Sequence, residues 1–187
     1  SMCESWVNLI KEKLKIFLNS EELFDEEKSK KFEDLIKYCH IDFKEEKTFK
    51  NLENLLKNNQ NEERIFYFST SSDFYETICK SLNDYKLISE NSRVVLEKPI
   101  GKDLDSSKEI NEKVLGYFKE EQIYRIDHYL GKDTVQNLLA LRFSNKMFVP
   151  LWDANNIDHI QITLSESVGV ESRWEFYNEY GAMRDMV

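Results

Sequence analysis

The stretch Arg125-Ile126-Asp127-His128-Tyr129-Leu130-Gly131-Lys132 decides how the rest of the chain is interpreted. It follows a short apolar run and precedes a helical pattern, so charged and polar side chains gather where a strand gives way to a helix. Open α/β sheets bind their ligands at such places, outside the carboxyl ends of the strands. Taken alone, the stretch leaves two interpretations open for His128 and Lys132: a ligand site, or a buried hydrogen-bonded imidazole and a solvated cation at a helix start.

Short apolar runs predict strands at residues 65–68, 93–97 and 122–127. The first run is continuous, as expected of a strand that is covered on both faces. Helical patterns separate the runs. The first begins at Ser71-Ser72-Asp73, with Asp73 and Glu76 at capping-box spacing, and the second runs from about Asp105 to Phe118. This order of elements predicts parallel strands with right-handed crossovers, as in the second half of a nucleotide-binding sheet.

The flanking segments have other patterns. The first sixty residues have helical spacing, and Asp25 and Thr48 are placed to cap the second and third of three helices. A helix is expected after the quoted stretch, and residues 158–165 alternate apolar and polar, as in a strand with antiparallel neighbours. We therefore expect an α/β chain in two parts. Residues 1–127 would be an incomplete Rossmann-like domain, and residues 128–187 would begin an α+β domain with an antiparallel sheet.

Composition restricts the class of protein. A chain of 187 residues can form one domain and part of another. Its net charge of -9 disfavours binding to nucleic acid or to an anionic membrane, and no apolar run is long enough to span a bilayer. Three scattered cysteines suit free thiols in a reducing compartment better than disulfides or a zinc site. We expect a cytoplasmic protein without a metal site.

Two motifs resemble the glucose-6-phosphate dehydrogenase family, which carries out the first step of the oxidative pentose phosphate pathway. One is the quoted stretch, and the other is Glu97-Lys98-Pro99-Ile100-Gly101-Lys102-Asp103-Leu104 upstream of it. Two long motifs in the right order and spacing are a strong signal. The resemblance implies a Rossmann-like fold and a homodimer or homotetramer. It also implies oxidation of glucose 6-phosphate to a lactone, with NADP as cofactor.

The resemblance also implies site residues. His128 and Tyr129 would hold the substrate phosphate, and Lys132 would bind substrate beside them and take part in catalysis. If a helix started near Tyr129, His128 and Lys132 would lie one turn apart on the same side. Lys98 would contact both the sugar and the cofactor.

Three further residues match the family by position. Glu166 aligns with a carboxylate that binds sugar hydroxyls. Asp185 aligns with a carboxylate that binds substrate and orients the catalytic base, as carboxylates do for an imidazole tautomer. Tyr75 aligns with a tyrosine near the cofactor, although Ser71-Ser72 stand where relatives often carry Pro-Pro.

Two parts of the family pattern are missing. The five glycines never form the G-x-G-x-x-G pattern of a dinucleotide site. The sequence also stops before the histidine that serves the family as general base. We therefore expect an internal fragment that does not turn over by itself.

Parts of the sequence are also typical of two other classes of protein. Other Rossmann sugar oxidoreductases share Glu-Lys-Pro after a strand, but they lack the quoted stretch. A non-catalytic, helix-rich interaction module would have no need of His128 and Lys132 together.

Overall fold

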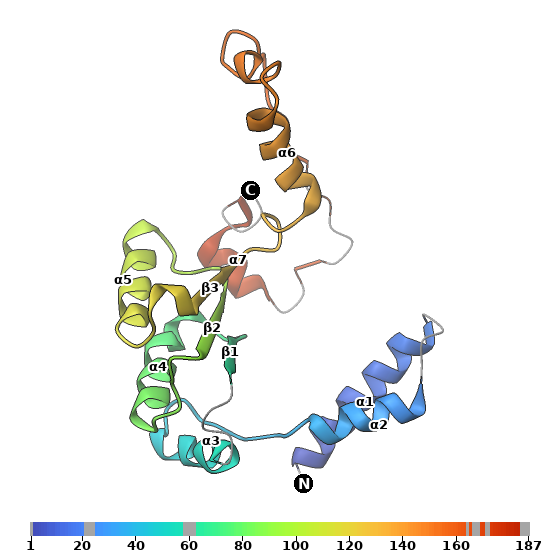
Figure 1. The fold of residues 1–187 in the computed structure, drawn as a ribbon, viewed down its shortest axis with the longest axis vertical. Helices are drawn as coiled ribbons and strands as arrows, with labels where there is room; N and C mark the ends of the chain where they lie inside the picture. Colours follow the sequence, from blue (N-terminus) through green and yellow to red (C-terminus); the bar gives the residue numbers. More distant parts are fainter. Residues whose placement is uncertain are drawn as a thin grey trace. The chain divides into compact units, whose positions relative to one another are not determined.

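The computed structural model describes residues 2–20, 25–57, 63–163, 165, 169–170 and 173–183 (Figure 1). The chain divides into two compact units, residues 1–60 and 61–187. The first unit contains the expected helices α1 (Met2–Ser20), α2 (Glu26–Leu35) and α3 (Phe49–Leu56), with a 3₁₀ turn, η1 (Glu46–Thr48), before α3. An ion pair of 2.9 Å between Lys11 and Glu33 joins α1 to α2.

The two helix caps expected in the first unit have different outcomes. Asp25 caps α2 as expected, because its carboxylate accepts a hydrogen bond of 3.1 Å from the backbone N–H of Lys28. The expected cap of α3 was wrong, since the Thr48 side chain makes no capping bond. Thr48 already has helical backbone angles at the end of η1, and its hydroxyl donates back to the carbonyl of Glu45 at 2.7 Å.

The second unit contains a parallel sheet of three strands in the order β1-β2-β3. The strands are β1 (Arg64–Phe68), β2 (Ser92–Glu97) and β3 (Ile123–Ile126). Helices α4 (Tyr75–Asp84) and α5 (Leu104–Leu115) connect them and lie on the same side of the sheet (Figure 1). Short 3₁₀ turns, η2 (Ser72–Phe74) and η3 (Glu120–Gln122), precede α4 and β3. The expected parallel strand-helix order is confirmed.

The face of the sheet that carries the helices is buried, and the other is open. Val94 and Leu96 of β2 are fully buried, whereas Ile65 and Tyr67 of β1 are 66% and 52% exposed. The expectation that β1 is covered on both faces was therefore wrong for the described part of the chain. The physical reason is that both crossover helices pack on the same face.

The starts of α4 and α5 also differ from each other. At α4 the expected Asp73–Glu76 capping box is absent. Instead the Ser71 hydroxyl accepts from the backbone N–H of Asp73 at 3.4 Å, because a 3₁₀ turn comes before the helix. A complete capping box forms at α5, between Asp103 and Ser106. At the end of α5, Val114 and the following Phe118 are buried, but Leu115 is 43% exposed.

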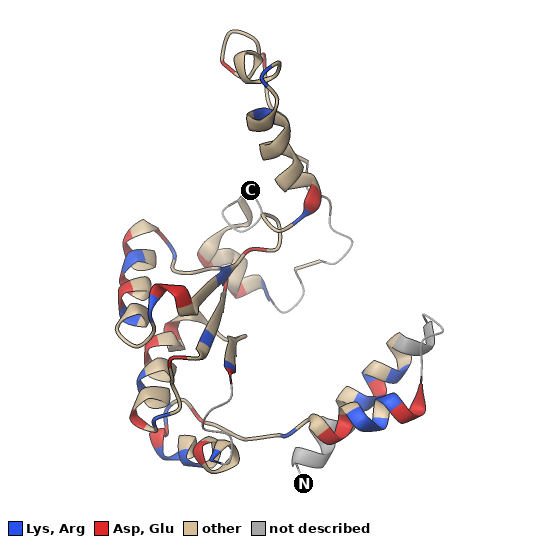
Figure 2. Ribbon diagram, in the orientation of Figure 1, with Lys and Arg blue, Asp and Glu red and all other residues tan. Residues whose placement is uncertain are grey.

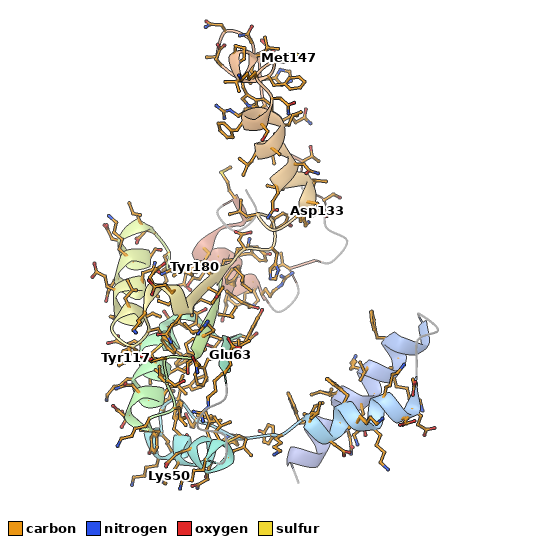
Figure 3. The ribbon with its side chains drawn as sticks, viewed as in Figure 1. Lys50, Glu63, Tyr117, Asp133, Met147 and Tyr180 are labelled. Atoms are coloured by element: carbon orange, nitrogen blue, oxygen red, sulfur yellow. The ribbon has the colours of Figure 1, made fainter. Side chains whose placement is uncertain are left out.

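Beyond the sheet, α6 (Asp133–Ser144) confirms the helix expected after the quoted stretch, and η4 (Val149–Leu151) and α7 (Trp174–Tyr180) follow. Figure 2 shows that the charges of α6 lie at its two ends, with Asp133 in the first turn and Arg142 in the last. No described residue of α6 is buried, and Met147 beyond it is 74% exposed (Figure 3).

Residues 158–163 and 165 form no strand, so the antiparallel pairing expected there is not formed within the described chain. A strand is stabilised by hydrogen bonds to a neighbour, and the described residues supply none for this segment. The domain boundary expected at residue 128 stays a prediction. Among the described residues, no helix is both long and apolar enough to cross a membrane.

Candidate functional site

The site is built at the carboxyl ends of β1 and β2, which lie side by side because Phe68 pairs with Leu96. Glu97 at the end of β2 is held from two directions. The Tyr67 hydroxyl donates to its carboxylate, and the Tyr75 hydroxyl donates to its backbone carbonyl at 3.2 Å. The hydrogen bond to Glu97 raises the pKa of Tyr67, and burial raises the pKa of Tyr75. Both phenols therefore stay protonated and able to donate at neutral pH.

Two lysines meet at one aromatic ring beside this edge. The Lys98 ammonium, directly after β2, lies 5.1 Å from the centroid of the Tyr129 ring. The Lys132 ammonium lies 4.4 Å from the same centroid. Such contacts are attractive because the ring face is electron-rich. The cluster of Lys98, Tyr129 and Lys132 thus concentrates positive charge at the carboxyl edge of the sheet, as an anion site requires.

Asp127 holds the turn that carries this cluster. Its carboxylate accepts from the backbone N–H groups of Tyr129 and Leu130, at 2.8 and 3.2 Å. The backbone N–H of Gly131 donates to the Asp127 carbonyl at 3.1 Å. Asp127 therefore braces the motif.

The turn also corrects the expected start of the following helix. Residues 128–131 form a turn and α6 begins at Asp133, so His128 and Lys132 are not one helical turn apart. The His128 side chain is exposed and has no hydrogen bond or ion pair within the described residues. The structure therefore brings together Lys98, Tyr129 and Lys132, and it does not bring the His128 imidazole into contact with them.

The remaining predicted site residues have different positions. Tyr75 is 1% exposed, with its ring 5.4 Å from that of Phe68, so it is packed in the core behind Glu97. Its expected contact with the cofactor stays a prediction. Glu166 and Asp185 lie outside the described residues.

Two hollows meet at Lys98-Pro99, whose peptide bond is cis. The first, here called the hydroxyl hollow, has a volume of about 570 Å³. It is lined by residues 69–72, residues 97–99, Arg173, Phe176 and Tyr180. Thr70 contributes a buried hydroxyl oxygen that has no hydrogen-bond partner in the described chain. A polar atom in that condition can be satisfied by a bound ligand or by water.

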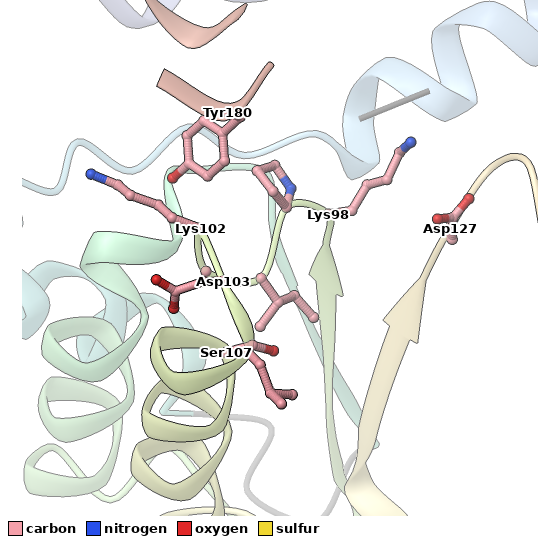
Figure 4. A pocket seen from close by; sticks show the side chains of 10 residues that line it. Lys98, Lys102, Asp103, Ser107, Asp127 and Tyr180 are labelled. Carbon is pink, nitrogen blue, oxygen red and sulfur yellow. The ribbon is translucent and has the colours of Figure 1, made fainter. Parts of the chain in front are cut away.

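The second, here called the lysine hollow, has a volume of about 540 Å³ and is lined by residues 98–104, Ser107, Asp127 and Tyr180 (Figure 4). Figure 4 shows Lys98 and Lys102 pointing in opposite directions, with the Tyr180 ring between them. Lys102 is ion-paired with Glu179 of α7. That interaction raises the pKa of Lys102, so its charge is retained at neutral pH.

Sequence reasoning missed the contribution of α7. Tyr180 borders both hollows, and its ring is stacked on that of Phe176 at 4.9 Å with an angle of 25° between the planes. The signal was available, because two aromatic residues at i and i+4 of a helix lie on the same face. What the sequence could not supply was the place where that face packs.

The described residues contain no group of three or more His, Cys, Asp or Glu side chains arranged to hold a metal ion. The described site consists of two ammonium groups at the Tyr129 ring and of the two hollows next to them. An anionic group can bind at Lys98, Tyr129 and Lys132, and a second group can lie next to it in a hollow at the carboxyl ends of the strands.

Comparison with known families matches almost the whole chain. Residues 2–137 match the family described as "Glucose-6-phosphate dehydrogenase, NAD binding domain". Residues 139–187 match "Glucose-6-phosphate dehydrogenase, C-terminal domain". The transition between the two matches lies within α6.

Curated relatives carry the same name. The glucose-6-phosphate 1-dehydrogenase of Rhizobium meliloti (strain 1021) is 47% identical over 174 residues, which are 93% of this chain and 35% of the relative. That of Gluconobacter oxydans (strain 621H) is 53% identical over 124 residues, which are 66% of this chain and 25% of the relative. The chain thus spans little more than a third of the length of such relatives.

Solved structures agree. A crystal structure of glucose-6-phosphate 1-dehydrogenase from Mycobacterium avium superposes with a TM-score of 0.72 at 30% identity, covering 97% of this chain and 40% of that one. A glucose-6-phosphate dehydrogenase in complex with its substrate glucose-6-phosphate gives a TM-score of 0.74 at 30% identity, covering 96% and 39%.

Proposed function

The chain belongs to the glucose-6-phosphate dehydrogenase family, and from this premise we propose that it is an internal part of an NADP-dependent glucose-6-phosphate dehydrogenase. The enzyme would oxidise glucose 6-phosphate to 6-phosphogluconolactone, the first step of the oxidative pentose phosphate pathway. The observation that carries the proposal is the pair of ammonium groups at Tyr129, beside the carboxyl ends of the parallel strands.

The substrate phosphate is assigned to the Lys98, Tyr129 and Lys132 cluster. A phosphate dianion needs fixed cations and hydrogen-bond donors, and charge-assisted bonds of this kind are the strong ones. Lys132 supplies a cation, the Tyr129 hydroxyl supplies a donor, and His128 next to them can turn toward a bound phosphate from its exposed position. Lys98 then lies between the proposed phosphate site at Tyr129 and the hydroxyl hollow. From this position its ammonium group can orient the sugar carbon that is oxidised.

The hydroxyl hollow is a suitable place for the nicotinamide end of the cofactor. It lies at the carboxyl ends of parallel strands, where such sheets bind dinucleotides. Its volume is within the range of small-molecule sites, and the unpartnered Thr70 oxygen is a polar group that a ligand can satisfy. Lys98 would contact the cofactor there, and Tyr75 is proposed to support it through Glu97. When bound, NADP supplies the acceptor for the hydride removed from the sugar.

Proton removal is assigned to a general base outside this sequence. Asp185 would bind substrate and orient that base, and Glu166 would bind sugar hydroxyls. We further propose that residues 1–127 belong to the cofactor domain and that residues 128–187 begin the domain for substrate and dimerisation. A homodimer or homotetramer in the cytoplasm is part of the same proposal.

The test of this function is the variant Lys132→Ala in the complete enzyme. Its kcat/KM for glucose 6-phosphate should fall by orders of magnitude, because a cation that contacts the phosphate is lost, while the melting temperature stays near that of the parent. The matched control is Lys119→Ala, which removes an exposed lysine whose ion pair is with Glu90. Near-normal turnover by the Lys132 variant would contradict the assignment.

A phosphate-binding experiment separates the enzyme from an interaction module. Crystals soaked in glucose 6-phosphate should show the phosphate beside Lys132. A bare site in an ordered pocket would favour the non-catalytic interpretation.

A further inference from the structure

Tyr180 is the one described residue of α7 that borders both hollows. Phe176 lines the hydroxyl hollow alone. Figure 4, which draws the lysine hollow, shows the Tyr180 ring above the loop that follows β2, on the side away from Asp127. At this position the Tyr180 ring forms part of the wall of both hollows, which Lys98 and Pro99 also line.

One contact of the Tyr180 ring itself and two contacts of neighbouring residues surround this position. The face of the ring is stacked on Phe176 at 4.9 Å, and Phe176 has an edge-on contact of 5.3 Å with Tyr177. The residue before it, Glu179, is ion-paired with Lys102 on the loop after β2. Tyr180 is half-buried, so part of its surface remains available. An aromatic surface that is already oriented loses little freedom when a ligand binds to it.

The surroundings indicate the class of ligand group that this wall would accept. The hydroxyl hollow is also lined by the polar groups of residues 69–72. A planar ring with polar substituents suits a space whose lining combines aromatic rings with hydroxyl groups. The face of the Tyr180 ring attracts positive charge, whereas Lys98 and Arg173 in the same lining repel it, so it is the contribution of the ring alone that favours a cationic group.

We propose that Tyr180 is a positioning residue whose ring stacks on the nicotinamide of the cofactor in the hydroxyl hollow. This inference rests on the proposed function, because it takes the ligand to be NADP. The oxidised nicotinamide carries a positive charge and the reduced one does not. Tyr180 therefore favours the oxidised form, which is the form that must bind before the reaction.

The test measures binding by calorimetry in the complete enzyme, without substrate and without turnover. Three ligands are titrated: NADP, NADPH, and adenosine 2′,5′-bisphosphate, which has the adenosine part and lacks the nicotinamide. Tyr180→Leu should raise the Kd of NADP about three- to tenfold, the range expected for loss of one aromatic stacking contact. The Kd of NADPH should rise less, and the Kd of adenosine 2′,5′-bisphosphate should not change.

Two control variants complete the experiment. Tyr180→Phe keeps the ring and should bind all three ligands as the parent does. Trp174→Leu removes an exposed ring from the same helix that borders neither hollow, and it should also bind as the parent does. If the leucine variant does not fold, a fluorinated phenylalanine at position 180 replaces it. That side chain keeps the size of the ring but weakens its attraction to a cation.

Two results would overturn the inference. The first is an unchanged Kd of NADP in Tyr180→Leu. The second is an equal loss of affinity for adenosine 2′,5′-bisphosphate, which would mean that the residue supports the cleft in general. A parent enzyme that binds neither NADP nor NADPH would instead overturn the proposed function, and with it this inference.

Discussion

At the scale of single residues, the site depends on side chains with more than one partner. Tyr129 offers its ring to the ammonium groups of Lys98 and Lys132, while its backbone N–H donates to Asp127. Mutation can separate the contribution of the ring from that of the hydroxyl. The ring gathers the two cations, and the hydroxyl is the part proposed to reach the phosphate.

We predict that Tyr129→Phe in the complete enzyme raises the KM for glucose 6-phosphate by about tenfold or more, since a hydrogen bond to a charged group is lost. The melting temperature should stay near that of the parent, because the ring and its contacts with the lysines remain. Tyr129→Leu should lose both functions and have a larger effect on KM. Equal KM values for the parent and the phenylalanine variant would exclude the hydroxyl as a phosphate ligand.

At the scale of secondary-structure elements, Arg125 connects three of them. Its guanidinium makes two hydrogen bonds to the Glu120 carboxylate of η3, at 2.8 and 3.2 Å, and one of 2.7 Å to Asn111 of α5. The first residue of the quoted stretch therefore fixes β3 against the helix that precedes it. The same interaction lowers the pKa of Glu120 below its usual value of 4.5.

The depressed pKa predicts a pH dependence of stability. A carboxylate of this kind stabilises the fold fully above its unfolded pKa, and the contribution is lost as the pH falls through its lower folded pKa. Glu120→Gln should therefore be slightly less stable than the parent at pH 6, and the difference should shrink below about pH 4.5. Denaturant unfolding of the complete enzyme at several pH values measures it. Glu121→Gln is the control, because Glu121 makes no ion pair within the described residues, and it should give no such trend.

Whether an element could be predicted from the sequence depends on whether the interactions that form it are local. Apolar runs and capping residues act within a few positions, so β1, β2, β3 and the cap at Asp25 were predictable. The delayed start of α6 was not, since it depends on the turn that closes at Gly131.

Other features depend on contacts that are distant in sequence. The exposure of Tyr67 depends on which face of the sheet receives both helices. Tyr180 borders the loop after β2, and the ion pair there between Lys102 and Glu179 joins residues that no local pattern connects. The assignments of Glu166 and Asp185 came from the family resemblance, and they stay predictions.

At the scale of the whole molecule, the proposed reaction needs groups that this sequence does not contain. The described residues bring two ammonium groups to the Tyr129 ring and line two hollows that meet at Lys98-Pro99. The glycine-rich turn and the general-base histidine that the resemblance implies are not among its residues. The chain matches both family domains and spans 35% of the length of the Rhizobium meliloti relative.

We predict that residues 1–187 by themselves do not reduce NADP in the presence of glucose 6-phosphate. The physical reason is that proton removal needs a base beside the sugar, and His159 is exposed and paired with Asp158 while His128 faces solvent. The measurement is absorbance of NADPH with the complete enzyme as a positive control. Turnover above the enzyme-free rate would show that a base lies within the chain.

The open face of the sheet has a practical consequence. Ile65, Tyr67 and Tyr124 are each more than half exposed, and β1 is hydrogen-bonded to β2 alone among the described strands. A strand with an unpaired edge and an apolar surface recruits strands from other molecules. A preparation of residues 1–187 alone would therefore tend to precipitate or to form soluble aggregates. Such a preparation would need a low protein concentration. It would also need a fusion partner that keeps the β1 edges of different molecules apart.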